Sequence, residues 1–327
     1  MRNAVYSVGV IGCGRIVSGF DAPGDSRVFT HLHALTTNPR FRVAGVFDTD
    51  DSATAAASVK WSVPGVGGFS KLAELAPDIF LIAVPDEGHK HYLDAVLDAR
   101  PSLVLCEKPI TPSLDESRSA VKRYADLGVK LAVGYQRRFD ADVNAIRDKY
   151  RSGALGRFLG GTVWFSKGLL HNGSHAVDLL RFVLGEVTSA RALGSRFDFT
   201  PQDPSVAAVV AFAAGDVFFA IGDERCFSIF EIDLLFEQAR YRLTDSGMQF
   251  EVAAVRADLH FAGYKTLVVE ENRASTLVHA LARMWESTAL ALDSGAPMVN
   301  TAAEALRTQE ICADLIQQAR STGASRS

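Results

Sequence analysis

The pattern that most constrains the fold lies in the first 135 residues, where short apolar runs rich in β-formers alternate with amphipathic segments. Such alternation is typical of a parallel sheet whose strands are joined by crossover helices. The run at 79–84 is apolar throughout, which suits a strand covered on both faces. We therefore predict a doubly wound α/β domain. Its strands are predicted at 5–11, 41–47, 79–84, 103–106 and 130–133, and its helices at 52–59, 71–75, 87–99 and 114–127.

The pattern changes after about residue 150, where strand-like runs follow one another closely. Close spacing with short turns predicts an open, mainly antiparallel sheet. Its strands include 158–165, 206–212, 217–221, 229–236 and 249–255, and helices are predicted at 174–184, 275–293 and 301–318. We therefore expect an α/β domain at 1–135, an α+β domain at 136–320 whose last helix is able to pack on the first domain, and a disordered tail at 321–327.

The composition excludes several classes of partner. The 34 basic and 38 acidic residues leave a formal charge of −4 without basic runs, which argues against nucleic acid and anionic membranes. The longest apolar run, 206–214, is shorter than the ~20 residues of a membrane helix. The N-terminus resembles no secretion signal, and the four cysteines are scattered singly, so we expect a cytoplasmic protein.

A glycine-rich segment gives the strongest local signal for a ligand. The sequence VGVIGCGRIV ends a predicted strand and opens a helix, as a G-x-G-x-x-G motif does. Gly12 is expected to make the tight turn, and Gly14, with Arg15 and Ile16, to let a pyrophosphate approach the backbone N–H groups. Val17 replaces the third glycine, which loosens the packing of helix on strand. The alternative is a glycine turn in a protein that binds no nucleotide.

Asp48, at the end of the next predicted strand, fits the second half of a dinucleotide pattern. Its carboxylate can accept both ribose hydroxyls and would repel a 2′-phosphate. Asp50 and Asp51 follow without an adjacent Arg, which favours NAD over NADP. Asp48 lies 34 residues after Gly14, where about 20 is usual. We infer an insertion at 19–30 that lies beside the cofactor.

Four further motifs follow in order along the chain: PDEGH at 85–89, CEKP at 106–109, GYQRRF at 134–139 and GSHAVD at 173–178. Together with the glycine segment, they resemble the glucose-fructose oxidoreductase/inositol dehydrogenase (Gfo/Idh/MocA) family. The resemblance implies a Rossmann domain with a nicotinamide cofactor, a polyol or sugar substrate, and a homo-oligomer, dimeric or tetrameric, formed through the second domain's sheet. It also places Pro85, His89 and Glu107 beside the cofactor.

The lysine of the family's E-K-P motif falls on Lys108, and in the family it reaches the oxygen of the reacting carbon. A strand end followed by Pro109, with its fixed φ and missing N–H, directs Lys108 toward the crevice at the carboxyl ends of the strands. An ammonium group there stabilises an alkoxide as hydride leaves. The alternative is a solvated lysine. Both a cis and a trans Lys108–Pro109 bond are compatible with the sequence.

The family's catalytic histidine falls on His175, where imidazole suits proton exchange with a substrate hydroxyl. The alternative is a hydrogen-bonded histidine in the first turn of a helix. Asp178 shares its helix face and is interpreted as an orienting or capping residue. Many dehydrogenases of the family carry Asp four residues before the histidine, whereas this chain has His171, followed by Asn172. We interpret both as substrate-shaping groups.

Two basic residues and several histidines complete the set of candidates. Lys167 either neutralises a substrate phosphate or is a surface lysine. Arg137 either contacts substrate or pairs with an acid at the domain junction. No Cys or carboxylate spacing completes a metal site with the clustered histidines, so no metal is predicted; these are His31, His33, His89 and His91.

The predicted function is that of an NAD-dependent oxidoreductase of a sugar or sugar derivative, including nucleotide-linked sugars. Lys108 polarises the oxygen, His175 takes the proton, and the cofactor supplies the hydride chemistry. Two alternatives stay open. One is a lyase or glycosidase that uses bound NAD transiently. The other is a non-catalytic NAD-binding sensor, which the missing Asp favours and the joint presence of Lys108 and His175 opposes.

Overall fold

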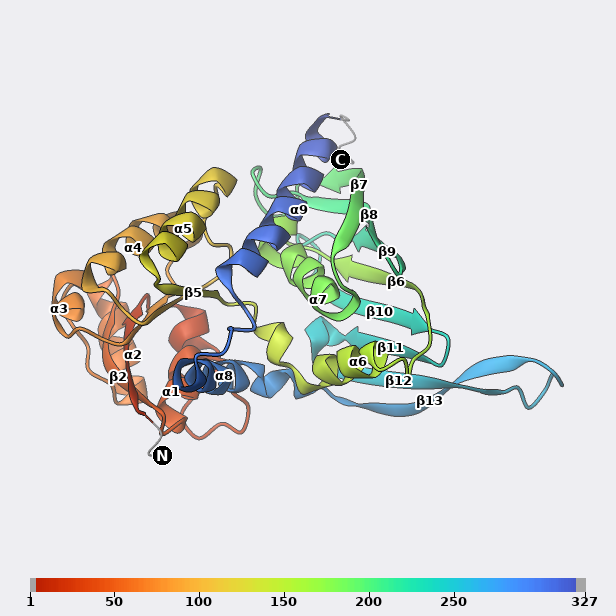
Figure 1. Cartoon of the computed structure of the whole chain (residues 1–327), viewed down its shortest axis with the longest axis horizontal. Helices are drawn as coiled ribbons and strands as arrows, with labels where there is room; N and C mark the ends of the chain where they lie inside the picture. The colour runs from red at the N-terminus through yellow and green to blue at the C-terminus, as the bar shows by residue number, and fades with distance from the viewer. Residues whose placement is uncertain (1–3, 322–327) are drawn as a thin grey trace. The chain divides into compact units, whose positions relative to one another are not determined.

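The computed structural model describes residues 4–321 and divides them into two compact units, each with its own sheet (Figure 1). The first unit holds the described residues through Phe139 together with Val278–Arg307. The second holds Asp140–Leu277 and the described residues from Thr308 onward. The first unit is therefore built from two separate stretches of chain. The sequence-based division lies at 135/136 and lets the last helix pack on the first domain, whereas the returning stretch of the structure is Val278–Arg307.

The first unit contains the predicted doubly wound sheet. All five strands are parallel, in the order β2-β1-β3-β4-β5. They are β1 (Tyr6–Ile11), β2 (Phe41–Phe47), β3 (Ile79–Ile82), β4 (Leu103–Cys106) and β5 (Lys130–Val133). Every residue of β3 and β4 is buried, because the sheet is covered on both faces. The crossovers include α2 (Asp51–Trp61), α3 (Phe69–Glu74), α4 (His89–Ala95) and α5 (Leu114–Leu127), the last capped by the side chain of Ser113, which accepts from Glu116 N.

The crossover from β1 to β2 differs from a single long helix. A five-residue π-helical turn, Arg15–Gly19, follows the glycine segment, and α1 (His31–Thr37) comes only after a loop at 20–30. Asp21 orders this loop, because its buried carboxylate accepts hydrogen bonds from Phe29 N, Thr30 Oγ1 and His33 Nδ1. The inferred insertion is therefore a folded segment anchored to α1.

The second unit contains an eight-stranded sheet in the order β13-β12-β11-β10-β6-β9-β8-β7. Its pairs are antiparallel except β6 with β9, which confirms the predicted class. Helices α6 (Ala141–Arg151), α7 (Ser174–Leu184) and the later part of α9 (Ala302–Ser321) lie on one face and share its core (Figure 1). The strands are β6 (Phe158–Phe165), β7 (Val187–Arg196), β8 (Ser205–Phe212), β9 (Gly215–Ile221), β10 (Phe230–Phe236), β11 (Ala239–Thr244), β12 (Gln249–Ala257) and β13 (Lys265–Ala274).

The end of the chain departs from the sequence prediction at one residue. Ser321 is the last residue of α9, so the predicted disordered tail does not begin there. The remainder of that prediction, 322–327, lies outside the described residues. None of the helices between residues 4 and 321 combines the length and apolar composition that crossing a membrane requires.

The returning stretch 278–307 completes the first unit. Its helix α8 (Ala280–Ser294) buries Trp285 completely, with the indole 5.2 Å from the Phe41 ring. Beyond α8, Asn300 pairs with the edge strand β5. Its side-chain Nδ2 donates to Val133 O at 2.8 Å, and its backbone carbonyl oxygen accepts from Val133 N at 2.9 Å. The segment thus fills the core and covers a strand edge that would otherwise expose unpaired backbone groups.

We expect a fragment that ends at Phe139 to lack a cooperative unfolding transition, because removing a buried Trp alone costs about 3–5 kcal/mol of a total stability of about 5–15 kcal/mol. Fusing Phe139 to Val278–Arg307 through a flexible Gly/Ser linker should restore the transition. Urea unfolding followed by far-UV circular dichroism measures both. A cooperative transition of equal midpoint in the two fragments would contradict this account.

Asp21 predicts a defined pH dependence. Burial works to raise its pKa, but the hydrogen bonds from Thr30, Phe29 and His33 outweigh burial and lower the pKa. Because the pKa is lower in the folded state, the stabilisation is present above the unfolded pKa of about 3.9 and is lost as the pH falls through the folded value. Asp21→Asn should lower the free energy of unfolding by about 1–3 kcal/mol at neutral pH. Between neutral and acid pH, the variant should lose less stability than the wild type, because it lacks the titrating carboxylate.

Urea unfolding at about pH 7 and about pH 3, on either side of that pKa, measures this effect. The matched control is Asp25→Asn, because Asp25 lies in the same loop, is exposed and caps only Ala22 N. Equal stability losses for Asp21→Asn and Asp25→Asn would show that the buried carboxylate does not hold the loop.

Candidate functional site

The glycine turn sits where β1 ends, at the carboxyl edge of the parallel sheet. Gly12 has φ +97°, and a Cβ there would lie 2.4 Å from the carbonyl oxygen of Ala83, so the position requires glycine. A Cβ on Gly14 would meet nothing within 4 Å, which leaves open space over this backbone. Val17, at the third glycine position, is fully buried. The turn therefore fits the close approach of a pyrophosphate at Gly14.

Arg15 and Ile16 open the π-helical turn rather than a long α-helix. The turn spans only Arg15–Gly19, so the field of an aligned helix is smaller here than the motif implies. The Arg15 guanidinium lies 4.7 Å from the centre of the Phe20 ring. Backbone N–H groups, more than a helix dipole, are the available anion donors of this segment.

Asp48 follows β2 directly and contacts the glycine turn. Its Oδ2 accepts from Cys13 N at 2.7 Å, and its Oδ1 accepts from Asp50 N at 3.0 Å. These bonds fix the carboxylate beside the turn, where the sequence places the ribose hydroxyls. Gly12, Gly14 and Asp48 are thus brought together at one edge of the sheet, as a bound dinucleotide requires.

His89 joins the segments that follow β3 and β4. Its buried ring has Nε2 3.0 Å from Val84 O and Nδ1 2.7 Å from Pro109 O. Carbonyl oxygens only accept, so both contacts are satisfied when both ring nitrogens carry protons. Pro85, the next residue after Val84, precedes a short 3₁₀ turn, Asp86–Gly88. His89 therefore holds the Lys108–Pro109 segment, whose peptide bond is cis.

Glu107 and Lys108 follow β4 at the same carboxyl edge. The Glu107 carboxylate contacts His31, with Oε1 2.9 Å from Nε2. Burial works to raise the pKa of Glu107, but the hydrogen bond from His31 and the charge of Lys108 bring it below its usual value. Asp86 behaves in the opposite way, because burial raises its pKa despite the charges of His89 and Lys108. Lys108 thus stands beside an ionised carboxylate.

The second unit carries the other predicted residues on one segment. Lys167 has left-handed backbone geometry with φ +71°, and a π-helical turn, Gly168–Gly173, leads into α7. The backbone N–H groups of Leu170 and His171 both donate to Asp203, at 2.7 and 2.8 Å. Asp203 therefore shapes the segment that precedes His175, and sequence reasoning missed it because it lies in a distant loop.

Lys167, His171 and Asn172 are half-buried, whereas Leu169 in the same segment is fully buried. The His171 ring lies 4.7 Å from the Phe199 ring, and the Lys167 ammonium lies 5.8 Å from the centre of the same ring. Asn172 Nδ2 donates to Ser166 O at 2.9 Å. His171 and Lys167 thus share one aromatic neighbour, which has no counterpart among the residues predicted from the sequence.

His175 lies in the first turn of α7, half-buried, with its ring edge-on to Phe230 at 6.3 Å. Asp178 is buried, and its Oδ1 accepts from Thr308 Oγ1 at 3.3 Å. Arg137 is half-buried in the first unit, whereas the neighbouring Arg138 donates to Val299 O at 2.9 Å. Lys108 and Arg137 therefore belong to one unit and His175 to the other.

The histidines are engaged in other contacts than metal binding. His33 bonds Asp21, His31 bonds Glu107, and His91 packs edge-on against Tyr92. Within residues 4–321, no three His, Cys, Asp or Glu side chains come together as a metal site would require. The four cysteines are free thiols.

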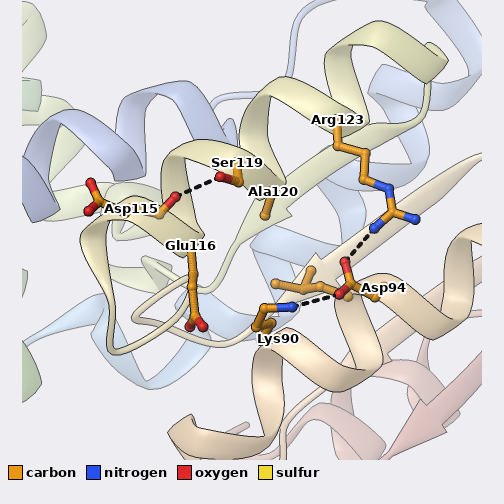
Figure 2. Close-up of a pocket in the computed structure, with 8 residues that line it drawn as sticks. Lys90, Asp94, Asp115, Glu116, Ser119, Ala120 and Arg123 are labelled. Carbon is orange, nitrogen blue, oxygen red and sulfur yellow. Dashed lines mark hydrogen bonds and ion pairs between the residues drawn. The ribbon is translucent and has the colours of Figure 1, made fainter.

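A further pocket lies between α4 and α5, and none of the predicted site residues lines it (Figure 2). Lys90 Nζ and Arg123 NH1 both donate to the Asp94 carboxylate, at 2.9 and 2.7 Å. Ser119 Oγ donates to the Asp115 carbonyl at 2.9 Å. These partly exposed charges pair with one another, as a solvated helix face does.

Comparison with known proteins shows similarity to one family over the first unit. Residues 6–135 match the model of the GFO_IDH_MocA family, described as an oxidoreductase family with an NAD-binding Rossmann fold. The inositol 2-dehydrogenase of Mycolicibacterium gilvum is 30% identical over 202 residues, 57% of this chain and 53% of that protein. That of Rhodococcus erythropolis is 30% identical over 228 residues, 63% of this chain and 61% of that protein. The chain thus spans little more than half the length of these relatives.

A solved structure supports the fold over nearly the whole chain. The WlbA dehydrogenase from Bordetella pertussis, in complex with NADH and UDP-GlcNAcA, has a TM-score of 0.77 at 18% identity and covers 98% of this chain and 97% of its own. Residues 6–135 of this chain are thus similar to the NAD-binding Rossmann domain of the GFO_IDH_MocA oxidoreductase family, in keeping with the family expected from the motifs.

Proposed function

We propose that this protein is an NAD-dependent dehydrogenase or reductase that acts on a hydroxyl or keto carbon of a sugar, polyol or sugar derivative. The observation that carries the proposal is the carboxyl edge of the parallel sheet. Gly12, Gly14 and Asp48 meet there around the ends of β1 and β2, and Lys108 follows β4 at the same edge. This is where open α/β sheets bind ligands.

Each residue of this edge has a defined role. The backbone at Gly12 and Gly14 receives the pyrophosphate, and the fixed carboxylate of Asp48 receives the ribose hydroxyls, which favours NAD. Pro85 and His89 line the end of β3. The nicotinamide, when bound, supplies the hydride chemistry. Lys108 polarises the oxygen of the reacting carbon, because an ammonium group stabilises the negative charge that develops there.

The second unit supplies the proton transfer and the substrate surface. His175 exchanges a proton with the substrate hydroxyl, since its imidazole suits general acid and base work near neutral pH. His171, Asn172 and Lys167 shape the substrate surface, and Arg137 contributes a positive charge from the first unit. The stacking of His171 on Phe199 supports a shaping role, because the ring packs against a neighbour in its own unit.

The substrate class rests on the similar proteins. The curated relatives are named inositol 2-dehydrogenases, and one solved structure of the same fold is a complex with UDP-GlcNAcA. A cyclic polyol and a nucleotide-linked sugar share neighbouring secondary hydroxyls on a six-membered ring. We therefore place the substrate among such ring hydroxyls.

The test is a turnover screen of the whole protein with NAD, NADH and their 2′-phosphorylated forms against polyols, free sugars and nucleotide-linked sugars. Nicotinamide absorbance reports net hydride transfer, which we expect with NAD(H) at a higher kcat/KM than with NADP(H). Exchange of substrate hydrogen with solvent without net NADH would instead identify the transient-redox lyase or glycosidase. Binding of NADH with silence across the panel would identify the sensor.

Lys108→Ala and His175→Ala should each lower kcat/KM by about 10²–10⁴-fold, because each removes a group that acts on the developing charge or proton. NADH affinity, measured by fluorescence titration, should change little in His175→Ala. Lys122→Ala is the matched control for charge, because Lys122 is exposed on α5 and its ammonium group pairs with Asp126 on the same helix. Wild-type turnover in either active-site variant would refute the assigned roles.

We also propose that the chain forms a homo-oligomer through the sheet face opposite α6 and α7. Exposed apolar side chains point outward from three adjacent strands, at Trp164, Phe218 and Leu235. Beside them, Arg240 pairs with Asp233 and Arg242 with Glu251 across neighbouring strands. Exposed apolar side chains that stand beside paired charges are typical of protein–protein interfaces.

Trp164→Arg combined with Leu235→Glu should shift the protein to a smaller assembly, because two charges would have to be desolvated at the contact. Light scattering coupled to size-exclusion chromatography measures the mass. Leu127→Glu on α5, an exposed apolar residue of the first unit, is the control. A wild-type mass equal to one chain, or an unchanged mass in the double variant, would exclude this face as the interface.

A further inference from the structure

Three buried side chains form a chain that connects α8 to the motif that carries Lys108. The indole Nε1 of Trp285 lies 3.0 Å from His31 Nδ1, and His31 Nε2 lies 2.9 Å from Glu107 Oε1. Trp285 and His31 are fully buried, and the Glu107 side chain is 15% exposed. The three residues come from α8, α1 and the end of β4, all within the first unit.

The chemistry of the donors fixes the direction of this chain. An indole N–H only donates, so His31 Nδ1 must accept and carries a lone pair. The ring proton then resides on Nε2, which donates to the Glu107 carboxylate. A proton on Nδ1 would place two N–H groups against each other in a site without water access. Trp285 therefore selects one neutral tautomer of His31.

The Glu107 carboxylate is confined on its other side as well. A Cβ on Gly134 would lie 2.5 Å from Glu107 Oε1, so the carboxylate occupies the space that this glycine leaves. Glu107 Oε2 also lies 3.4 Å from Lys108 N. The carboxylate thus has one accessible position, and that position is set by His31.

We propose that His31 is a positioning residue, which fixes Glu107 and through it the backbone of Lys108, and that Trp285 sets the His31 tautomer. The expected effect of His31 on catalysis through Lys108 rests on the proposed function. The hydrogen bonds among Trp285, His31 and Glu107 do not depend on it. Neither His31 nor Trp285 belongs to the motifs on which the family resemblance rests. The hydrogen bonds from Trp285 to His31 and from His31 to Glu107 give these two residues roles beyond core packing.

The tautomer is tested without turnover. Long-range ¹⁵N–¹H spectra of the histidine rings, with the His31 signals assigned by their loss in His31→Gln, report which nitrogen carries the proton. We expect protonated Nε2 and unprotonated Nδ1 in the wild type at neutral pH, and a change toward mixed tautomers in Trp285→Phe. A wild-type ring protonated on Nδ1, or on both nitrogens, would overturn the proposal.

The positioning role is tested by paired substitutions. His31→Leu removes the donor to Glu107, whereas His31→Gln keeps an amide donor, so we expect kcat to fall about 10- to 100-fold in the first and to recover in the second. KM should change less than kcat, since binding groups stay in place. In a Glu107→Gln background, His31→Leu should no longer lower kcat, because the carboxylate that His31 positions has already been removed.

His33→Leu is the matched control, because His33 lies two residues away in α1, is equally buried and bonds Asp21 instead of Glu107. Urea midpoints of all variants separate loss of folding from loss of position. Equal kcat values for His31→Leu and His33→Leu at equal stability would overturn the positioning role. A wild type without turnover on any substrate would count against the proposed function. The ring-nitrogen spectra would still test the His31 tautomer and its hydrogen bonds to Trp285 and Glu107.

Discussion

The close approach of two backbones at Gly12 is the constraint on which the first unit depends. The turn after β1 passes so near Ala83, which follows β3, that a side chain of any size would have to displace the carbonyl. Because β1 lies between β2 and β3 in the sheet, this contact sets the spacing of three strand ends. Asp48, Pro85 and the glycine turn share one edge as a result.

Much of the first unit could be predicted because its strands carry a local signal. The predicted bounds of β2, β4 and β5 match the structure to the residue. Largely apolar runs marked these strands, since strands covered on both faces favour apolar side chains. The exceptions are Arg42 in β2 and Lys130 at the start of β5, and both are exposed. The strands β7, β11 and β13 lacked such runs. In β11 the outward Arg240 and Arg242 alternate with buried residues, and in β13 nearly every side chain is exposed. Their place in the sheet comes from pairing, which short windows of sequence do not encode.

The candidate site divides in the same way. The glycine turn, Asp48 and Lys108 were predictable because each follows a strand end that composition marks. Asp203 and Phe199 were not, because they reach the 167–175 segment from a loop about thirty residues later. His31 and His89 share a residue type, whereas the structure gives them unrelated partners, Glu107 for the first and the carbonyls of Val84 and Pro109 for the second. The role of a buried histidine depends on the hydrogen-bond partners of its Nδ1 and Nε2 atoms, which the residue type alone does not indicate.

The divided first unit has a consequence for the order in which the chain is made. Synthesis proceeds from the N-terminus at about 5–20 residues per second, so β5 and the pocket for Trp285 emerge long before residues 278–307. Until then, the edge of β5 has no Asn300 to pair with, and His31 has no indole to choose its tautomer. The first unit is therefore completed only after most of the second unit has been made, although its glycine motif is translated first.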